Sequence, residues 1–522
     1  MRDRQDATFV VRLLGIAALT ALAACGSGGG GEPDTGDGGS NDWKPGVFKP
    51  SSSFAGRCES PRAGTTDLEG SVLDENNFLR SYSDETYLWY DEIVDQNPAS
   101  FTSALAYFDE LVTLEMTPSG APKDRFHFTI STDEWERLSQ SGESAGYGAQ
   151  WAVLEPNPPS RVVRVAYTEP DSPATAPTVQ LARGADVLTV DGASVANGNA
   201  NTLNAGLFPA AAGEPHTFTI RDLGSTVTRE ITMTSAIVTS SPVQNVKSVD
   251  TPMGKVGYLL FNDHIATAEG QLIDAVEQLA AESVQHLVVD LRYNGGGFLA
   301  IASEFAYMIA GAVPTAGATF EEIRFNDKHP TTDPVTGEPL VPMPFFDETL
   351  GFSPSAPEGQ PLPSLNLQKV YVLAGPDTCS ASESIINSLR GVDVEVVLVG
   401  ATTCGKPYGF YPTDNCGTTY FTIQFQGFNN QGFGDYGDGF SPQNDPFGEA
   451  IPGCSVHDDF DHALGDPLEA RFKTALDLIQ GGSCPAPTGA APERGLAKPG
   501  ALHPPDGIAP KDPWRENRIL RR

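Results

Sequence analysis

Ser380 and Lys406 are the side chains of this sequence whose types and placement point most directly to chemistry. A serine hydroxyl is a poor nucleophile until a base takes its proton. A lysine serves as that base only where burial favours its neutral amine over the ammonium. The pair is therefore chemically meaningful only if the fold buries the lysine close to the serine.

The sequence around the two residues predicts a strand–helix–strand unit. Apolar runs at 369–374 and 394–399 have the pattern of buried strands, and residues 381–390 between them have the pattern of a helix. Such a unit forms two parallel strands with a right-handed crossover. Ser380 and Lys406 then lie just past the carboxyl ends of neighbouring strands, which are about 4.8 Å apart, so side-chain contact is feasible.

A third apolar run, 286–292, is predicted to be another strand, and it ends in the glycine triplet 295–297. Glycines at this position permit positive φ and allow backbone N–H groups to approach a ligand closely. In open α/β sheets, ligands bind beyond the carboxyl ends of the strands. Amides of this loop, with the amide that follows Ser380 at the helix N-terminus, would form an oxyanion hole.

Each of these features has a simpler explanation when it is taken alone. A serine before a helix is most often an N-cap, and Glu383 completes an S-x-x-E capping box. A glycine triplet is most often a turn, and a single lysine is usually a surface residue. The eight histidines are scattered, and none accompanies a Gly-x-Ser-x-Gly elbow. The joint placement at three strand ends favours the catalytic interpretation.

Three segments resemble the C-terminal-processing, or tail-specific, serine peptidase family: 290–297 (DLRYNGGG), 378–383 (TCSASE) and 399–406 (VGATTCGK). The resemblance extends over roughly residues 70–480. It implies that Ser380 is the nucleophile and Lys406 its general base. It also implies oxyanion donors from Gly296 or Gly297 and from Ala381.

One departure from the family pattern concerns the neighbourhood of the lysine. Many members have a glutamine four residues after the lysine, where this chain has Phe410. The residue that orients Lys406 therefore stays open between Glu383, Thr403 and Tyr408.

The sequence predicts a multidomain α+β fold with an α/β protease core. Aromatic residues at near-helical intervals indicate a helical N-terminal domain over 56–140, which the resemblance suggests is a cap over the active site. The catalytic domain is expected over 250–482. The Pro- and Ala-rich residues 483–522 are expected to be a disordered tail.

Short β-rich runs over 145–240 follow one another in an order that resembles a PDZ domain. A PDZ groove adds a peptide as an extra strand and captures its terminal carboxylate on backbone amides. These amides would lie near Gly146, Tyr147 and Gly148. The alternative is a β-domain that only packs against the protease.

Residues 1–24 have the basic start, short apolar run and small residues of a secretory signal peptide. The Leu-Ala-Ala-Cys sequence that ends at Cys25 resembles the bacterial lipobox, which implies cleavage before Cys25 and lipidation of its thiol. The alternative is ordinary cleavage with Cys25 unmodified. Residues 25–55 would form a flexible tether. The expected location is the bacterial cell envelope, with a lipid anchor at the outer membrane or on the periplasmic or extracellular face.

The chain has seven cysteines, and those other than Cys25 form an even-numbered set that suggests disulfides in an exported protein. Because Cys379 precedes Ser380 and Cys404 comes two positions before Lys406, we expect a Cys379–Cys404 bridge. A Cys416–Cys454 bridge is a second expectation. No Cys-x₂-Cys or His-x₃-His spacing occurs, so we expect no metal and no cofactor.

The sequence therefore predicts an exported, membrane-anchored serine endopeptidase that cleaves proteins or peptides through an acyl-enzyme. The net charge of −34 opposes binding to nucleic acid. Two other functions remain compatible with the residues. One is a peptide-binding lipoprotein that does not cut, and the other is an acyl hydrolase of non-peptide esters.

Overall fold

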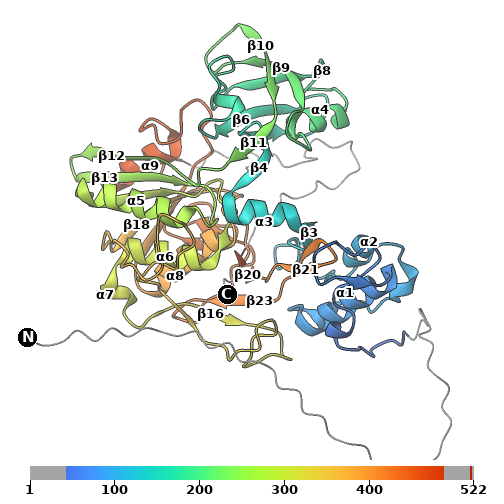
Figure 1. Cartoon of the computed structure of the whole chain (residues 1–522). Coiled ribbons are helices and arrows are strands. Elements are labelled where there is room, and N and C mark those ends of the chain that lie inside the picture. Colours follow the sequence, from blue (N-terminus) through green and yellow to red (C-terminus); the bar gives the residue numbers. More distant parts are fainter. Residues whose placement is uncertain (1–42, 487–517, 520–522) are drawn as a thin grey trace, which may run out of the picture. The chain divides into compact units, whose positions relative to one another are not determined.

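The computed structural model describes residues 43–486 and 518–519 of the chain (Figure 1). The predicted signal peptide, Cys25 and the tether up to residue 42 lie outside the described residues. The prediction of a flexible tether is wrong for residues 43–55, because Ser51 N–H donates to Glu85 and Arg80 donates to the Val47 carbonyl. Within the described ranges, no helix has both the length and the apolar character needed to cross a membrane.

A six-stranded sheet forms the centre of the fold, in the order β12-β13-β14-β18-β19-β26. β12 is antiparallel to β13, and the other neighbouring pairs are parallel. A parallel sheet that is covered on both faces requires strands that are apolar throughout, which explains the continuous runs of Val and Leu. The strands span Val243–Thr251 (β12), Gly254–Phe261 (β13), His286–Asp290 (β14), Lys369–Ala374 (β18), Glu395–Gly400 (β19) and Gly453–Ser455 (β26).

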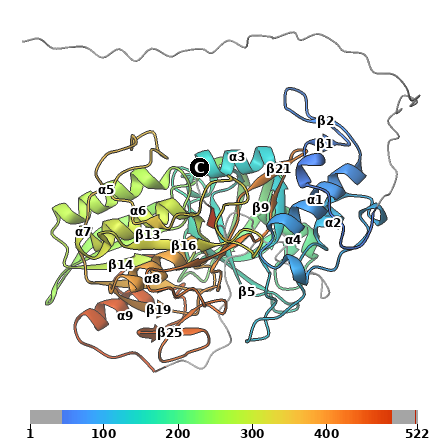
Figure 2. The same cartoon turned by 90° about the horizontal axis from the view of Figure 1, so that it is seen from below.

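Helices cover both faces of this sheet (Figure 2). The helices α5 (Ala268–Ala281), α6 (Leu299–Ala310) and α8 (Ala381–Gly391) share one apolar cluster with the sheet, and α9 (Ala470–Ile479) packs on the opposite face. The short helix α7 (Ala312–Thr315) follows α6. The predicted strand–helix–strand unit is confirmed, because α8 connects β18 to β19 and these two strands are parallel neighbours. The predicted α/β core is thus present.

Residues 143–239 contain a β-domain with an apolar cluster of its own. Its main strands are antiparallel in the order β10-β9-β7-β6-β5, and β8 pairs with β7. A two-stranded sheet of β4 and β11 lies where the chain enters and leaves the domain. The elements are β4 (Glu143–Gly146), β5 (Ala149–Glu155), β6 (Val162–Thr168), β7 (Asp186–Val190), β8 (Ala193–Ser194), α4 (Ala200–Leu207), β9 (Pro215–Arg221), β10 (Thr228–Thr234) and β11 (Ala236–Thr239).

The N-terminal region is less helical than its aromatic pattern predicts. Its helices are α1 (Val72–Thr86), α2 (Ala104–Phe108) and α3 (Thr132–Ser141), separated by turns and the short strands β1 (Arg57–Cys58), β2 (Leu68–Glu69) and β3 (Phe128–Ser131). Apolar residues continue at near-helical intervals to Ile93, but α1 ends at Thr86. Leu88 and Trp89 instead pack against the cluster of the catalytic core, and Leu88 N–H donates to the Ile423 carbonyl. Tertiary packing thus overrides the helical spacing in this segment.

Short strands join the N-terminal region to the remainder of the core. β3 pairs with β22, and β16 pairs with both β17 and β23. Residues 325–366 contain only the short strand β17 among irregular segments. The strands are β16 (Thr319–Arg324), β17 (Met343–Pro344), β20 (Tyr408–Gly409), β21 (Thr413–Asn415), β22 (Thr418–Phe421), β23 (Phe425–Phe428), β24 (Phe440–Pro442) and β25 (Glu449–Ile451).

Three disulfides link the described cysteines. The expected Cys379–Cys404 bridge is confirmed. The expected Cys416–Cys454 bridge is wrong, because Cys416 bonds to Cys58 and Cys454 bonds to Cys484. The reason is one of location. Cys416 follows β21, which contacts the N-terminal region through a hydrogen bond from Gly56 N–H to Asn415. Cys454 lies in the edge strand of the central sheet.

The predicted tail over 483–522 also needs correction at both described ends. Cys484 is held to β26 by its disulfide, so the ordered chain extends beyond residue 483. Arg518–Ile519 (β27) pairs with Gly297–Phe298 (β15). The composition of the tail gave no indication of either contact, because both depend on residues that are distant in the sequence. Residues 487–517 and 520–522 lie outside the described residues.

The Cys58–Cys416 bridge should contribute strongly to stability, because it closes a sequence separation of 358 residues. We expect Cys58→Ser combined with Cys416→Ser to lower the free energy of unfolding of the N-terminal region by about 2–5 kcal/mol. Thermal unfolding without reductant measures the effect, and in reductant, which breaks all three disulfides, the native protein and the double variant should unfold alike. Equal unfolding of the oxidised native protein and the variant would contradict the assigned pairing.

Candidate active site

Ser380 lies at the carboxyl end of β18 and at the N-terminus of α8. Its φ of 59° is positive, which is uncommon for a residue with a side chain and persists only where surrounding contacts hold it. The side chain is buried, and its Oγ has no hydrogen-bond partner. Other buried hydroxyls, such as those of Ser83, Ser388 and Thr422, also have no hydrogen-bond partner, so this feature alone does not mark a nucleophile.

Lys406 follows β19 and is completely buried. Its Nζ lies 4.9 Å from the centre of the Phe126 ring and 4.3 Å from that of Phe410. Phe410, which replaces the glutamine common in the family pattern, therefore forms part of the apolar wall around the amine. Phe126 comes from the N-terminal region, and no local motif marks it, so sequence reasoning missed it.

The carboxylate of Glu383 connects the serine and lysine loops. It accepts hydrogen bonds from the N–H groups of Ser380 at 2.9 Å, Gly405 at 2.8 Å and Lys406 at 2.8 Å, and from the hydroxyl of Thr403. Burial raises the pKa of Glu383, while these hydrogen bonds act in the opposite direction. The geometry brings the two predicted residues into one hydrogen-bonded unit.

Two of the three candidates for orienting Lys406 belong to this unit, and the third does not. Glu383 holds the main chain of Lys406, and Thr403 donates to Glu383. Tyr408 lies in β20, where its ring packs edge-on against Trp89 at 4.7 Å. Arg125, which the sequence did not single out, also donates to the Cys404 carbonyl in the lysine loop.

The Cys379–Cys404 disulfide gives a second connection between the same loops. Beside it, Cys404 N–H donates to the Thr378 carbonyl at 3.0 Å. Both bonds lie within two residues of Ser380 or Lys406. The serine and lysine loops are thus joined covalently, by backbone contact and through Glu383.

The glycine loop is fixed by Asn294 and His264. The Asn294 Oδ1 accepts the Gly296 N–H at 2.9 Å, and the Asn294 carbonyl accepts the Cys379 N–H at 3.0 Å. His264 N–H donates to the Gly296 carbonyl, and Phe298 N–H donates to the His264 carbonyl. Of the predicted oxyanion donors, the Gly296 N–H is therefore already used.

Gly297 and Ala381 remain as the amides suited to an oxyanion hole. Along an extended strand, successive N–H groups face opposite edges, so the N–H of Gly297 faces away from His264. Its φ of 132° and a built Cβ only 2.4 Å from the His264 carbonyl oxygen explain why glycine is needed there. Ala381 is buried in the first turn of α8, where N–H groups have no intrahelical partner.

A buried ionic cluster holds the segment that leads from β14 into the glycine loop. Arg292, at the end of β14, contacts Asp290, Asp458 and Glu469 at 2.7–2.9 Å. Arg183 of the β-domain also contacts Asp458. Burial acts to raise the pKa of Asp458, but the Arg183 and Arg292 guanidinium groups outweigh it and hold that pKa well below its usual range. The cluster thus ties the β-domain to the base of the candidate site.

The predicted carboxylate-binding residues lie at a cavity of about 400 Å³ in the β-domain. Gly146, Tyr147 and Gly148 line it together with the end of α4 and with Asp263 and Ile265, which flank His264. The Tyr147 hydroxyl donates to the Gly206 carbonyl at 3.0 Å. The cavity therefore extends from the β-domain to the segment that holds the glycine loop.

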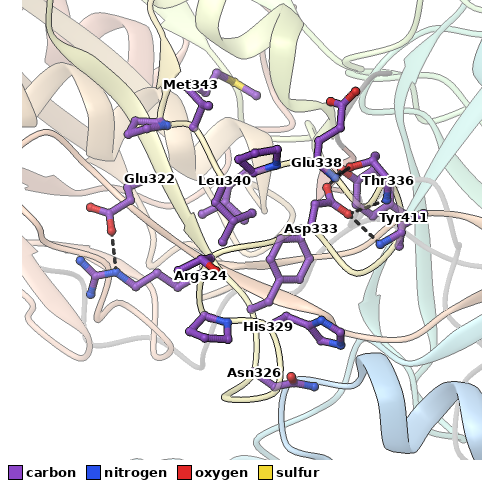
Figure 3. A pocket seen from close by; sticks show the side chains of 18 of the residues that line it. Glu322, Arg324, Asn326, His329, Asp333, Thr336, Glu338, Leu340, Met343 and Tyr411 are labelled. Carbon is purple, nitrogen blue, oxygen red and sulfur yellow. Dashed lines mark hydrogen bonds and ion pairs between the residues drawn. The ribbon is translucent and has the colours of Figure 1, made fainter.

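A cavity of about 1100 Å³ lies elsewhere and does not include the serine and lysine loops (Figure 3). Residues of β16 and of the following loop form it, together with Tyr411. Asp333 accepts a hydrogen bond from the Tyr411 hydroxyl, and Arg324 pairs with Glu322 at 2.9 Å.

Comparison with known proteins agrees with this arrangement. Residues 255–414 match the model of peptidase family S41. The chain is 27% identical over 277 residues to a carboxyl-terminal-processing protease of Picosynechococcus sp., and the alignment covers 52% of this chain. The chain spans only 56% of the length of that curated relative. A solved structure from Bacteroides fragilis assigned to the S41 proteases has a TM-score of 0.59 at 22% identity and covers 77% of this chain and 97% of its own. The resemblance to the C-terminal-processing peptidase family and the α+β fold class are confirmed.

Replacement of Glu383 should disturb both loops at once. Glu383→Gln substitutes an amide group for one accepting oxygen, which leaves two of the four donors facing N–H₂. Each unsatisfied buried donor costs about 1–3 kcal/mol. We expect a lower melting temperature and at least a tenfold loss of kcat with a smaller change in KM. Glu395→Gln, at the opposite end of β19, is the control. A native kcat in Glu383→Gln would contradict the role of Glu383 in holding the serine and lysine loops together.

Proposed function

We propose, from the match to peptidase family S41 and the geometry of the site, that this chain is a serine endopeptidase with a Ser–Lys dyad. The observation that carries the proposal is that Glu383 accepts hydrogen bonds from the main-chain N–H groups of both Ser380, at the N-terminus of α8, and the completely buried Lys406. Protein or peptide chains are the substrates.

In the proposed mechanism, the neutral amine of Lys406 takes the hydroxyl proton as Ser380 Oγ attacks the scissile carbonyl carbon. The N–H groups of Gly297 and Ala381 stabilise the oxyanion of the tetrahedral intermediate. Lys406 then gives its proton to the leaving amine, and an acyl-enzyme remains on Ser380. A water molecule that is activated by the same amine hydrolyses the ester and regenerates the hydroxyl.

The surroundings of Lys406 suit this role. Complete burial removes the hydration that stabilises an ammonium ion, and therefore favours the neutral amine that a base requires. The rings of Phe126 and Phe410 keep water away from Nζ. A charged amine would gain some attraction to these rings, so the proposal requires the loss of hydration to dominate.

Two further parts of the proposal concern substrate capture and location. The β-domain would act as a PDZ domain, with Gly146, Tyr147 and Gly148 receiving the terminal carboxylate of a peptide. The supporting observation is that the cavity they line reaches the neighbours of His264. Export and lipid anchoring at Cys25 are supported by the sequence alone.

Removal of either member of the dyad should abolish cleavage without unfolding the protein. We expect Ser380→Ala and Lys406→Met to reduce kcat/KM for a partly unfolded protein by about 10⁴-fold or more. Ser388→Ala, a buried serine further along α8, and Lys369→Met are the matched controls and should retain activity. Mass spectrometry of the products measures cleavage, and a parallel assay on small esters separates a peptidase from an acyl hydrolase. Near-native turnover in either dyad variant would refute the mechanism.

The pH dependence should be set by the lysine and not by His264. Burial lowers the pKa of His264 to about 3, so this residue is neutral throughout the range from pH 5 to 9. A lysine base works only when it is deprotonated, so kcat/KM should rise with pH. We expect His264→Asn, whose amide nitrogen replaces Nδ1, to lower the rate without moving the acid limb. An acid limb near pH 6.5 that disappears in this variant would identify histidine as the base.

A further inference from the structure

Arg518 and Ile519, from the C-terminal end of the described chain, lie next to the glycine loop. β27 pairs in parallel with β15, with Arg518 opposite Gly297 and Ile519 opposite Phe298. The same two residues also lie against β20, which begins two residues after Lys406. β27 is therefore situated between the glycine loop and the segment that follows the proposed base.

The pairing uses the edge of β15 that faces away from His264. On the other edge, the Gly296 carbonyl and the Phe298 N–H are bonded to His264. Because parallel pairing alternates along the strand, the N–H and carbonyl of Gly297 are the groups that face β27. The N–H of Gly297 is also one of the two proposed oxyanion donors. A peptide cannot occupy this position while Arg518–Ile519 is bound.

We infer that Arg518–Ile519 binds the catalytic groove as an added strand and restrains cleavage in cis. The inference rests on the proposed function, because it takes the free edge of β15 to be the substrate-binding edge. Strand addition is a common mode of peptide recognition, with main-chain hydrogen bonds supplying affinity. A tethered segment is present at an effective concentration on the order of millimolar, so even weak pairing competes with substrate.

Proline substitutions at Arg518 and at Ile519 test the pairing, because the register gives the two N–H groups different partners. The alternation makes the Ile519 N–H the donor to the Gly297 carbonyl, whereas the Arg518 N–H faces away from β15. Ile519→Pro removes that donor, and Arg518→Pro removes none of the bonds to β15. In the full-length protein, we expect Ile519→Pro to lower KM for a peptide substrate severalfold at unchanged kcat. Arg518→Pro should have a much smaller effect, and intact mass verifies that each protein retains residue 522.

A second measurement does not depend on activity. In the Ser380→Ala background, hydrogen exchange of the peptide that contains Gly297 and Phe298 should be faster with Ile519→Pro than with Arg518→Pro or without either change. Equal exchange in all three proteins would overturn the inference and leave the proposed function standing. Faster exchange with an unchanged KM would show that the segment binds but does not compete, which also overturns it. A retained exchange difference with no Ser380-dependent cleavage would refute the proposed function instead.

Discussion

The buried carboxylate of Glu383 is the interaction on which the geometry of the candidate site depends. It receives four hydrogen bonds, one from the serine loop and three from the lysine loop. Hydrogen bonds to a charged group contribute about 1.5–3 kcal/mol each and so reduce the cost of burying the carboxylate, although burial still raises the pKa of Glu383. Because a carboxylate only accepts, it can hold four donors that an amide or a hydroxyl cannot.

The central sheet brings together the two loops that bond to Glu383. β18 and β19 are parallel neighbours, so their carboxyl ends bring Ser380 and Lys406 to one edge. β14 lies on the other side of β18 and delivers the glycine loop to the same edge. The ionic cluster around Arg292 then fixes the end of β14, since a buried guanidinium with three carboxylate partners has little freedom to move.

The sequence predicts this edge well because its signals are local. Strands that are buried on both faces are continuous apolar runs in the sequence. A loop whose backbone must approach a ligand closely is marked by its glycines. Cys379 and Cys404 lie in loops that follow neighbouring strands, so their proximity can also be predicted. The signals fail where distant segments decide the structure. Phe126 in the wall around Lys406, the Cys58–Cys416 bridge and the end of α1 at Thr86 all depend on packing between the N-terminal region and the core. No local pattern encodes such contacts.

The capping-box and catalytic interpretations of Ser380 describe one arrangement and are not alternatives. Glu383 supplies its half of the box by accepting the Ser380 N–H, and this bond helps to hold the positive φ of the serine. The Ser380 side chain lies at the other half of the box, opposite the backbone N–H of Glu383, but its hydroxyl forms no capping hydrogen bond. The cost of an unsatisfied hydroxyl is tolerated because the hydrogen bonds of Glu383 and the disulfide fix both loops around it.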